Sequence, residues 1–166
     1  LSSALKYNLL EKNYNTIILS LDRWLLSDRK RGEGVLNRYA IKEIEELILL
    51  LSNRPKEILI KIPFYNKITK ERMINYEEIS IKDSDIIIFE GTIALFLLDL
   101  VSYKKRTSWY IELNEKIRRQ RFFNEYKLRK FEKNQIEKIY DDREQDEHEV
   151  INYSSSKADS KIIMKA

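Results

Sequence analysis

The chain has 166 residues, of which 43% are hydrophobic and 35% are charged, which suits one domain with a core of its own. It contains no cysteine, which excludes disulfides and thiolate metal sites, and the apolar stretch at 86–98 is too short to span a bilayer. The net charge of +4 suits anionic ligands such as nucleotides as well as it suits nucleic acid. We therefore expect a cytoplasmic protein without a membrane segment.

The first half of the chain alternates helical and strand-like segments. Leucines at helical spacing predict the first helix, and an unalternating apolar run then predicts a strand that is buried on both faces. The predicted elements are a helix over 2–13, a strand over 16–21, a loop over 29–34, a helix over 41–51 and a strand over 58–62 that ends at Pro63.

The second half continues this alternation, which favours an α/β layered fold with a mostly parallel sheet. We expect one domain over 1–166. The predicted elements are a strand over 85–89, a helix over 92–102, a strand over 108–113, a helix over 114–126, a basic segment over 128–134, a helix over 136–153 and a strand over 158–164.

Two acidic residues follow the two clearest buried strands. Asp22 comes after the strand at 16–21, and Glu90 comes after the strand at 85–89. Ligands of open parallel sheets bind beyond the carboxyl ends of the strands. One carboxylate there can take a proton from an attacking hydroxyl, and the other can hold Mg²⁺. The alternative is that each acid is a helix cap or a loop charge.

Two further clusters carry groups that bind small anionic or hydroxylated molecules. Residues 63–72 hold aromatic, amide and cationic side chains that can contact a sugar, base or phosphate, although a solvated surface hairpin has the same composition. Arg118 and Arg121 share one face of a predicted helix and can neutralise charge on a phosphoryl group. The alternative is a solvated basic face that pairs with the later acids Asp141, Asp142 and Glu144.

Taken together, these segments resemble the uridine kinase and phosphoribulokinase group of P-loop kinases. The resemblance spans 2–163 and rests on the order and spacing of its pieces rather than on one motif. The pieces are residues 18–22, residues 62–65 with Thr69 and Arg72, residues 86–91, residues 109–112, Arg118 with Arg121, and residues 158–159.

The resemblance implies an ATP-dependent kinase with a three-layer P-loop NTPase-like fold, which phosphorylates a hydroxyl of a nucleoside-like or sugar-like molecule. ATP and the small acceptor would be its partners, and Mg²⁺ its metal. The implied roles are Asp22 as the base, Glu90 in the Mg²⁺ site, Tyr65, Arg72 and Tyr39 at the acceptor, Arg118 and Arg121 near the nucleotide, and residues 121–135 as a lid segment.

The chain departs from this family in three places. It contains no glycine-rich phosphate loop, so we expect that it is cut just after that loop, lacks the first strand, and is inactive alone. It has Tyr65-Asn66 and Lys70 where uridine kinases have Tyr-Asp and a downstream histidine, and residues 121–124 replace the family's lid pairs. These differences leave open a sugar or sugar phosphate as the acceptor.

The sequence also leaves two other functions open. A non-catalytic nucleotide- or partner-binding domain derived from such a kinase would fit the sparse glycine and the altered lid. Nucleic-acid binding through the basic residues 127–133 is less favoured, because acidic residues alternate with basic ones over the neighbouring helix. Homo-oligomerisation is left open.

Overall fold

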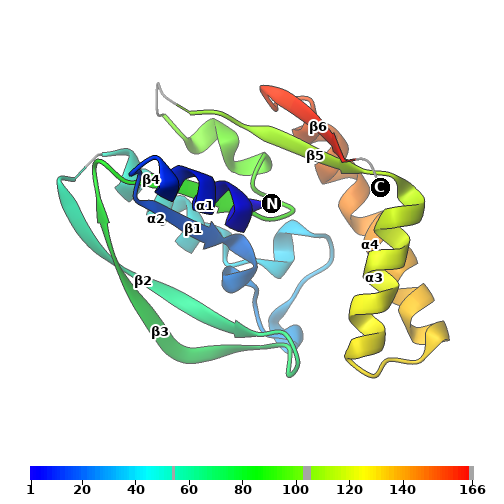
Figure 1. Ribbon diagram of the computed structural model, residues 1–166. Coiled ribbons are helices and arrows are strands. Elements are labelled where there is room, and N and C mark those ends of the chain that lie inside the picture. The colour runs from blue at the N-terminus through cyan, green and yellow to red at the C-terminus, as the bar shows by residue number, and fades with distance from the viewer. Residues whose placement is uncertain (54, 103–105, 165–166) are drawn as a thin grey trace. The chain divides into compact units, whose positions relative to one another are not determined.

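The computed structural model describes residues 1–53, 55–102 and 106–164, and for residue 74 it describes the main chain only. The chain divides into two compact units, residues 1–103 and residues 104–166, and each is described by itself (Figure 1). Among the described residues the strands form three two-stranded sheets, two of them parallel and one antiparallel. The predicted α/β class with mostly parallel pairing is confirmed.

A parallel strand pair lies at the centre of the first unit. Strand β1 (Thr16–Ser20) pairs with β4 (Ile86–Glu90), from Thr16 opposite Ile86 to Ser20 opposite Glu90. Helix α1 (Ser2–Glu11) packs beside β1. The β1 residue Leu19 is fully buried. The two apolar runs are therefore adjacent strands that end at the same edge of their sheet, as the sequence indicated.

The chain between β1 and the next helix forms a closed loop made of short 3-10 helices, at Leu21–Trp24, Asp28–Lys30 and Leu36–Arg38. Its two ends are joined by main-chain hydrogen bonds, from Leu26 to the Arg38 carbonyl at 2.8 Å and from Ala40 to the Trp24 carbonyl at 2.9 Å. Helix α2 (Ile41–Ser52) follows and buries the residues of one helical stripe, namely Ile44, Leu47, Ile48 and Leu51.

A long antiparallel hairpin forms the other sheet of this unit (Figure 1). Strand β2 (Glu57–Asn66) pairs with β3 (Glu71–Lys82). The prediction that Pro63 ends its strand is wrong, because the strand continues for three more residues. The register shifts between Pro63 and Tyr65, and an irregular position tolerates a residue that has no N–H to donate to the ladder.

The predicted helix over 92–102 is also wrong. The structure has a turn followed by the 3-10 helix Phe96–Leu100. Main-chain bonds three residues apart dominate, including Leu98 to the Leu95 carbonyl at 3.3 Å and Val101 to the Leu98 carbonyl at 3.1 Å. Residues 92–101 are apolar almost all round, so no polar stripe of α-helical period selects one buried face, and tight turns accommodate the segment.

The second unit joins a helical hairpin to a parallel strand pair. Strands β5 (Trp109–Leu113) and β6 (Ser160–Met164) pair in parallel, and α3 (Glu115–Leu128) and α4 (Lys133–Ser155) pack against each other. Stacked and edge-on rings of Phe122, Tyr126 and Tyr140 fill the space between the two helices. No helix in the described part of the chain is both long and apolar enough to cross a membrane.

Both helices of this unit begin with side-chain caps. The Asn114 side chain accepts a hydrogen bond from the Lys116 main chain at 3.0 Å at the start of α3. At the start of α4, Glu132 and Gln135 form a reciprocal capping box. The turn between the helices contains Lys130 in the left-handed region, with φ of 65°. The basic segment predicted at 128–134 therefore has a tight helix-to-helix turn in its middle, at residues 129–132, and its two ends belong to the helices.

Candidate active site

The two predicted acids lie at the carboxyl ends of neighbouring parallel strands. Glu90 is the last residue of β4 and stands opposite Ser20, and Asp22 comes two residues after Ser20, in the first turn of a 3-10 helix. Between them Gly91 has φ of 140°, and a Cβ built on it would lie 3.2 Å from the Cβ of Leu21. Residues with side chains rarely adopt that φ, so glycine lets the two strand ends approach closely.

The Asp22 carboxylate has a partner at each oxygen. The buried Tyr39 donates its hydroxyl to Oδ1 over 3.4 Å, and the Lys67 ammonium lies 3.0 Å from Oδ2. Tyr39, which we expected at the acceptor site, is therefore next to the predicted base. Lys67 belongs to the predicted cluster at 63–72, but its contact with Asp22 was not predicted, because the two residues are 45 apart and nothing in the local sequence pairs them.

The Glu90 carboxylate has no hydrogen-bond or ion-pair partner within the ranges that the structure describes, although the residue is half-buried. The same residues contain no group of three or more metal-ligating side chains. Mg²⁺ in nucleotide enzymes typically takes one or two carboxylates and completes its shell with phosphate and water. An unpaired carboxylate at this edge of the sheet fits that requirement.

Tyr65 is brought close to the loop that follows Asp22. Its hydroxyl accepts a hydrogen bond from Arg31, whose guanidinium also lies 5.3 Å from the centre of the Tyr65 ring. Arg31 is held in turn by the Leu26 carbonyl at 2.8 Å and by the Asp28 carboxylate at 2.8 Å. The predicted acceptor residue thus belongs to a connected polar network beside the strand ends.

Arg72 makes a bidentate ion pair with Glu43 of α2, over 2.8 and 2.5 Å. The hydrogen bond to Glu43 raises the pKa of the Arg72 guanidinium, against the opposing effect of burial. Its side chain is only 16% exposed. Arg72 therefore fastens the hairpin to α2 in this structure, and a role at the acceptor would be additional to that contact.

Arg23 is a second fastening that the sequence did not reveal. Its Nε donates to the Pro63 carbonyl at 2.9 Å, one Nη pairs with Glu77 at 2.7 Å, and the guanidinium lies 4.8 Å from the centre of the Phe64 ring. The other Nη is buried without a hydrogen-bond partner. Because Arg23 directly follows Asp22, this contact ties the predicted base to the irregular part of the hairpin.

The two arginines predicted near the nucleotide lie in the second unit. Arg118 pairs with Glu115 at 2.6 Å and with Glu144 at 2.5 Å. Burial is the largest single effect on the Arg118 pKa and lowers it, but these two hydrogen bonds, together with electrostatic interactions with Tyr140 and Glu115, raise the pKa overall. The pairing with Glu144 is the structural alternative that the sequence left open. Arg121 is exposed and has no ion-pair partner among the residues described. Neither arginine is placed relative to Asp22.

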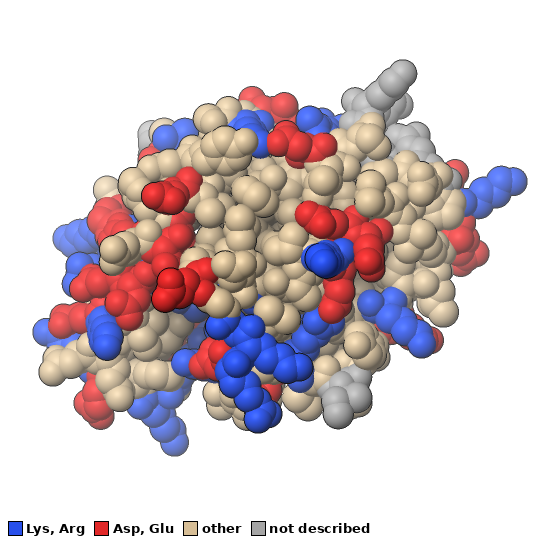
Figure 2. Space-filling view, turned by 180° about the vertical axis from the view of Figure 1, so that it is seen from behind, with Lys and Arg blue, Asp and Glu red and all other residues tan. Residues whose placement is uncertain are grey.

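The Arg118 guanidinium lies 5.4 Å from the centre of the buried Tyr140 ring. Tyr140 donates its hydroxyl to Glu115, and burial together with this hydrogen bond raises the pKa of Tyr140 to about 12. The same hydrogen bond is the main cause of the lowered pKa of Glu115. Figure 2 shows acidic and basic side chains mixed at the left and lower parts of the face, with other residues over much of its middle. Arg72 and Arg118, which the sequence predicted as ligand contacts, are each paired with carboxylates within the protein.

Comparison with solved structures finds similar chains with low sequence identity. A protein described as a possible uridine kinase, from Bacillus stearothermophilus, is 16% identical and aligns over 97% of this chain and 79% of its own, with a TM-score of 0.57. A protein provisionally described as a fructose transport system kinase, from Silicibacter sp. TM1040, is 14% identical over 97% of this chain and 81% of its own, with a TM-score of 0.72.

A third solved structure, the YGR205w protein, is 13% identical over 98% of this chain and 79% of its own, with a TM-score of 0.64. No family model and no curated protein sequence matches the chain. At these identities the likeness establishes the fold and leaves the substrate open. The chain therefore has the α/β fold of the uridine kinase-like P-loop kinases.

Proposed function

We propose that the chain belongs to an ATP-dependent phosphotransferase that phosphorylates a hydroxyl of a nucleoside-like or sugar-like molecule. The observation that carries the proposal is the pair of acids at the ends of two adjacent parallel strands. The kinase fold supports the same class of reaction.

In this proposal Asp22 orients the acceptor hydroxyl and takes its proton. Tyr39 holds one carboxylate oxygen, and Tyr65 and Arg72 hold the acceptor, because this type of catalysis depends mainly on positioning. Glu90 would hold Mg²⁺, which when bound with ATP neutralises charge on the phosphates. The fastening of Arg72 to Glu43 would keep the hairpin in place while the acceptor binds.

Arg118 and Arg121 are proposed to approach the phosphates of ATP, Arg121 from the start of a lid at 121–135 and Arg118 from just before it. The exposed Arg121 is available for such a contact, whereas Arg118 would have to exchange one of its two carboxylate partners for a phosphate. Arginine contacts of this kind stabilise charge that develops on the transferred group.

The proposal is tested with Asp22→Asn in the protein produced from its complete gene. Nucleosides, pentoses and sugar phosphates are screened with Mg-ATP, and transfer is measured together with nucleotide binding. We expect the variant to lose transfer by about 10²- to 10⁴-fold, the usual contribution of a general base, while binding ATP nearly as before.

The matched control is Asp83→Asn, the same chemical change at an exposed acid in the turn between β3 and β4. It should leave transfer unchanged. If Asp22→Asn instead abolished ATP binding while the protein stayed folded, Asp22 would not be the base.

A second candidate is a non-catalytic nucleotide- or partner-binding domain, and it is favoured by one observation. The 166 residues contain no glycine-rich phosphate loop ending in Lys-Ser or Lys-Thr. The gene sequence upstream of the Leu1 codon separates the two candidates. A phosphate loop there supports the kinase, and a complete gene without one supports the binding domain.

A further inference from the structure

The turn of the β2–β3 hairpin brings the Lys67 ammonium into contact with Asp22, the proposed base. Lys67 Nζ lies 3.0 Å from Asp22 Oδ2, and this is its one ion pair within the described ranges. The Lys67 side chain is 55% exposed, so it has room to move, whereas Asp22 is 34% exposed. An oxygen that accepts from an ammonium is less available to an acceptor hydroxyl.

The backbone that carries Lys67 is held firmly over the Asp22 loop. The Asn66 side chain accepts from the main chains of Ile68 and Thr69, at 2.9 and 3.1 Å. Beyond the turn, the Lys70 carbonyl accepts from the Asp28 main chain at 3.1 Å. The turn is thus braced from within and against the loop, and Lys67 can leave Asp22 by rotating its side chain alone.

The other cations around this turn each have an acid that is not the proposed base. The pairs are Arg31 with Asp28, Lys70 with Asp28, Arg29 with Glu71, and Arg72 with Glu43. When an acceptor hydroxyl engages Asp22, Lys67 is therefore the cation that loses its partner. A neutral acceptor offers no replacement, whereas an acceptor with an anionic group beside its hydroxyl does.

We propose that Lys67 is a specificity residue, which passes from Asp22 to an anionic group, phosphate or carboxylate, on the acceptor. The inference rests on the proposed function and narrows its acceptor to anionic sugars or polyols. In the reaction the acceptor oxygen bonds to the γ-phosphorus of ATP as the bond to the ADP oxygen breaks. The hydroxyl proton goes to Asp22 and then to solvent.

The test compares Lys67→Met and Lys67→Arg with the wild type, in the protein from the complete gene. The acceptors are ribose, ribose 5-phosphate, gluconate and uridine. Lys67→Met should raise KM for the preferred anionic acceptor about 10- to 100-fold, the usual cost of losing one hydrogen bond to a charged group. KM for ribose and uridine should stay within about 2-fold, and Lys67→Arg should restore most of the affinity because it keeps the charge.

Lys61→Met is the control, since Lys61 is an exposed lysine of β2 that pairs with Glu78 at 3.6 Å. It should change no KM. Preference for ribose 5-phosphate over gluconate would identify phosphate as the anion, and the reverse would identify carboxylate. An equal effect of Lys67→Met on neutral and anionic acceptors, or a wild-type preference for neutral ones, would overturn the role of Lys67.

Failure of the proposed function can be told apart from failure of the Lys67 role, because the wild type would then phosphorylate no acceptor. In that case calorimetry of ribose, ribose 5-phosphate and gluconate against wild type and Lys67→Met still tests the specificity. If the wild type binds ribose 5-phosphate or gluconate and Lys67→Met does not, the result supports an anion site at Lys67 even though no reaction occurs. Absence of charge-dependent binding rejects it.

Discussion

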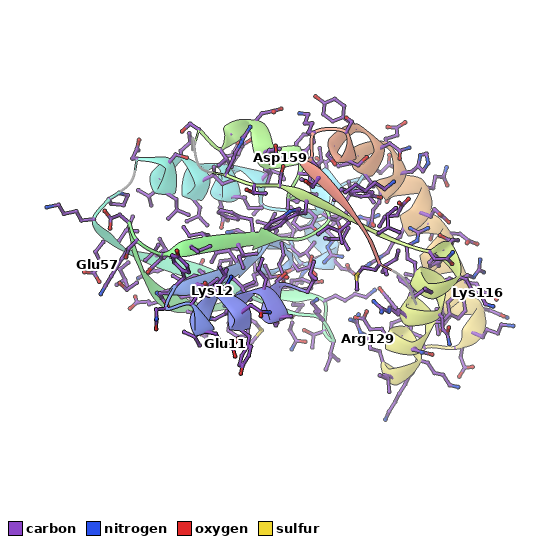
Figure 3. All side chains as sticks on the ribbon, turned by 45° about the horizontal axis from the view of Figure 1, so that its top comes forward. Glu11, Lys12, Glu57, Lys116, Arg129 and Asp159 are labelled. Carbon is purple, nitrogen blue, oxygen red and sulfur yellow. The ribbon has the colours of Figure 1, made fainter. Side chains whose placement is uncertain are left out.

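Asp159 shows how one carboxylate can hold the start of a parallel strand pair. It accepts hydrogen bonds from the Ser108 main chain at 2.7 Å and from the Ser108 hydroxyl at 2.8 Å, and its own main chain donates to that hydroxyl at 3.0 Å. Figure 3 labels Asp159 just before β6. The hydrogen bond from the Ser108 side chain is the main cause of its lowered pKa.

This lowered pKa predicts an acid-dependent stability. Since the folded pKa lies below the unfolded value of about 3.9, Asp159 adds stability above that value and loses it as pH falls through the folded pKa. Asp159→Asn should therefore be less stable than wild type at pH 7, and the difference should shrink below about pH 4. Urea unfolding followed by Trp109 fluorescence at several pH values measures it.

Asp141→Asn is the matched control on the exposed face of α4, and it should change the stability little. A difference between wild type and Asp159→Asn that stayed constant from pH 7 to pH 3 would show that ionisation of Asp159 does not stabilise the fold.

At the same scale, the sequence predicted some of the candidate site but not its closest contacts. Asp22 and Glu90 were found because an acid at the end of a buried apolar run is a local signal. The contact of Lys67 was missed because its partner is 45 residues away. The contacts of Arg23 were missed because its partners are 40 and 54 residues away. Such pairs depend on how the hairpin packs, and no periodicity in the sequence encodes that.

Among the elements, the β2–β3 hairpin depends on Arg23 for its attachment to the end of β1. Arg23→Met removes the hydrogen bond to Pro63 and the ion pair with Glu77. We expect the free energy of unfolding to fall by about 1–3 kcal/mol, since a hydrogen bond from a charged group is lost and the Pro63 carbonyl stays buried. Urea unfolding followed by Trp24 fluorescence measures this.

Two companion variants make this test specific. Arg23→Lys should recover only part of the loss, because an ammonium cannot reproduce the forked contact to a carbonyl and a carboxylate. Arg29→Met removes a pair in which the arginine is 81% exposed and 3.4 Å from Glu71, and should cost less than about 1 kcal/mol. Equal stability of Arg23→Met and wild type would contradict the fastening role.

The elements themselves were predictable where the local pattern was strong. Helix α2 follows from its apolar spacing, and the strands β1 and β4 follow from unalternating apolar runs, with ends that differ by a few residues. Strand β3 was missed because its mixture of charged, polar and apolar residues lacks a clear alternation. The helix expected over 92–102 failed because a segment that is apolar on all sides carries no helical stripe.

At the scale of the whole chain, the two units have cores of different size. The first buries many large apolar side chains, including Leu19, Leu21 and Ile62, whereas the buried hydrophobic residues of the second are Tyr126, Ile136 and Tyr140 among those described. Hydrophobic burial is the main stabilising term, so the second unit should be the less stable.

Each unit has one tryptophan, which allows this difference to be measured. Trp24 is 2% exposed in the first unit and Trp109 is 41% exposed in the second. In urea, the fluorescence of Trp24→Phe, which reports Trp109, should change at a lower midpoint than that of Trp109→Phe, which reports Trp24. Circular dichroism of both variants is the control for overall unfolding. One shared midpoint would show that the units unfold together.

The glycine between the two acids has a consequence for how the site could evolve. A Cβ at position 91 would press on Leu21. The substituted residue would also have to adopt a φ that only glycine tolerates well. The spacing between the strand ends that carry Asp22 and Glu90 is therefore set by a missing side chain, and we expect substitutions at this position to be tolerated less well than those in the surrounding loops.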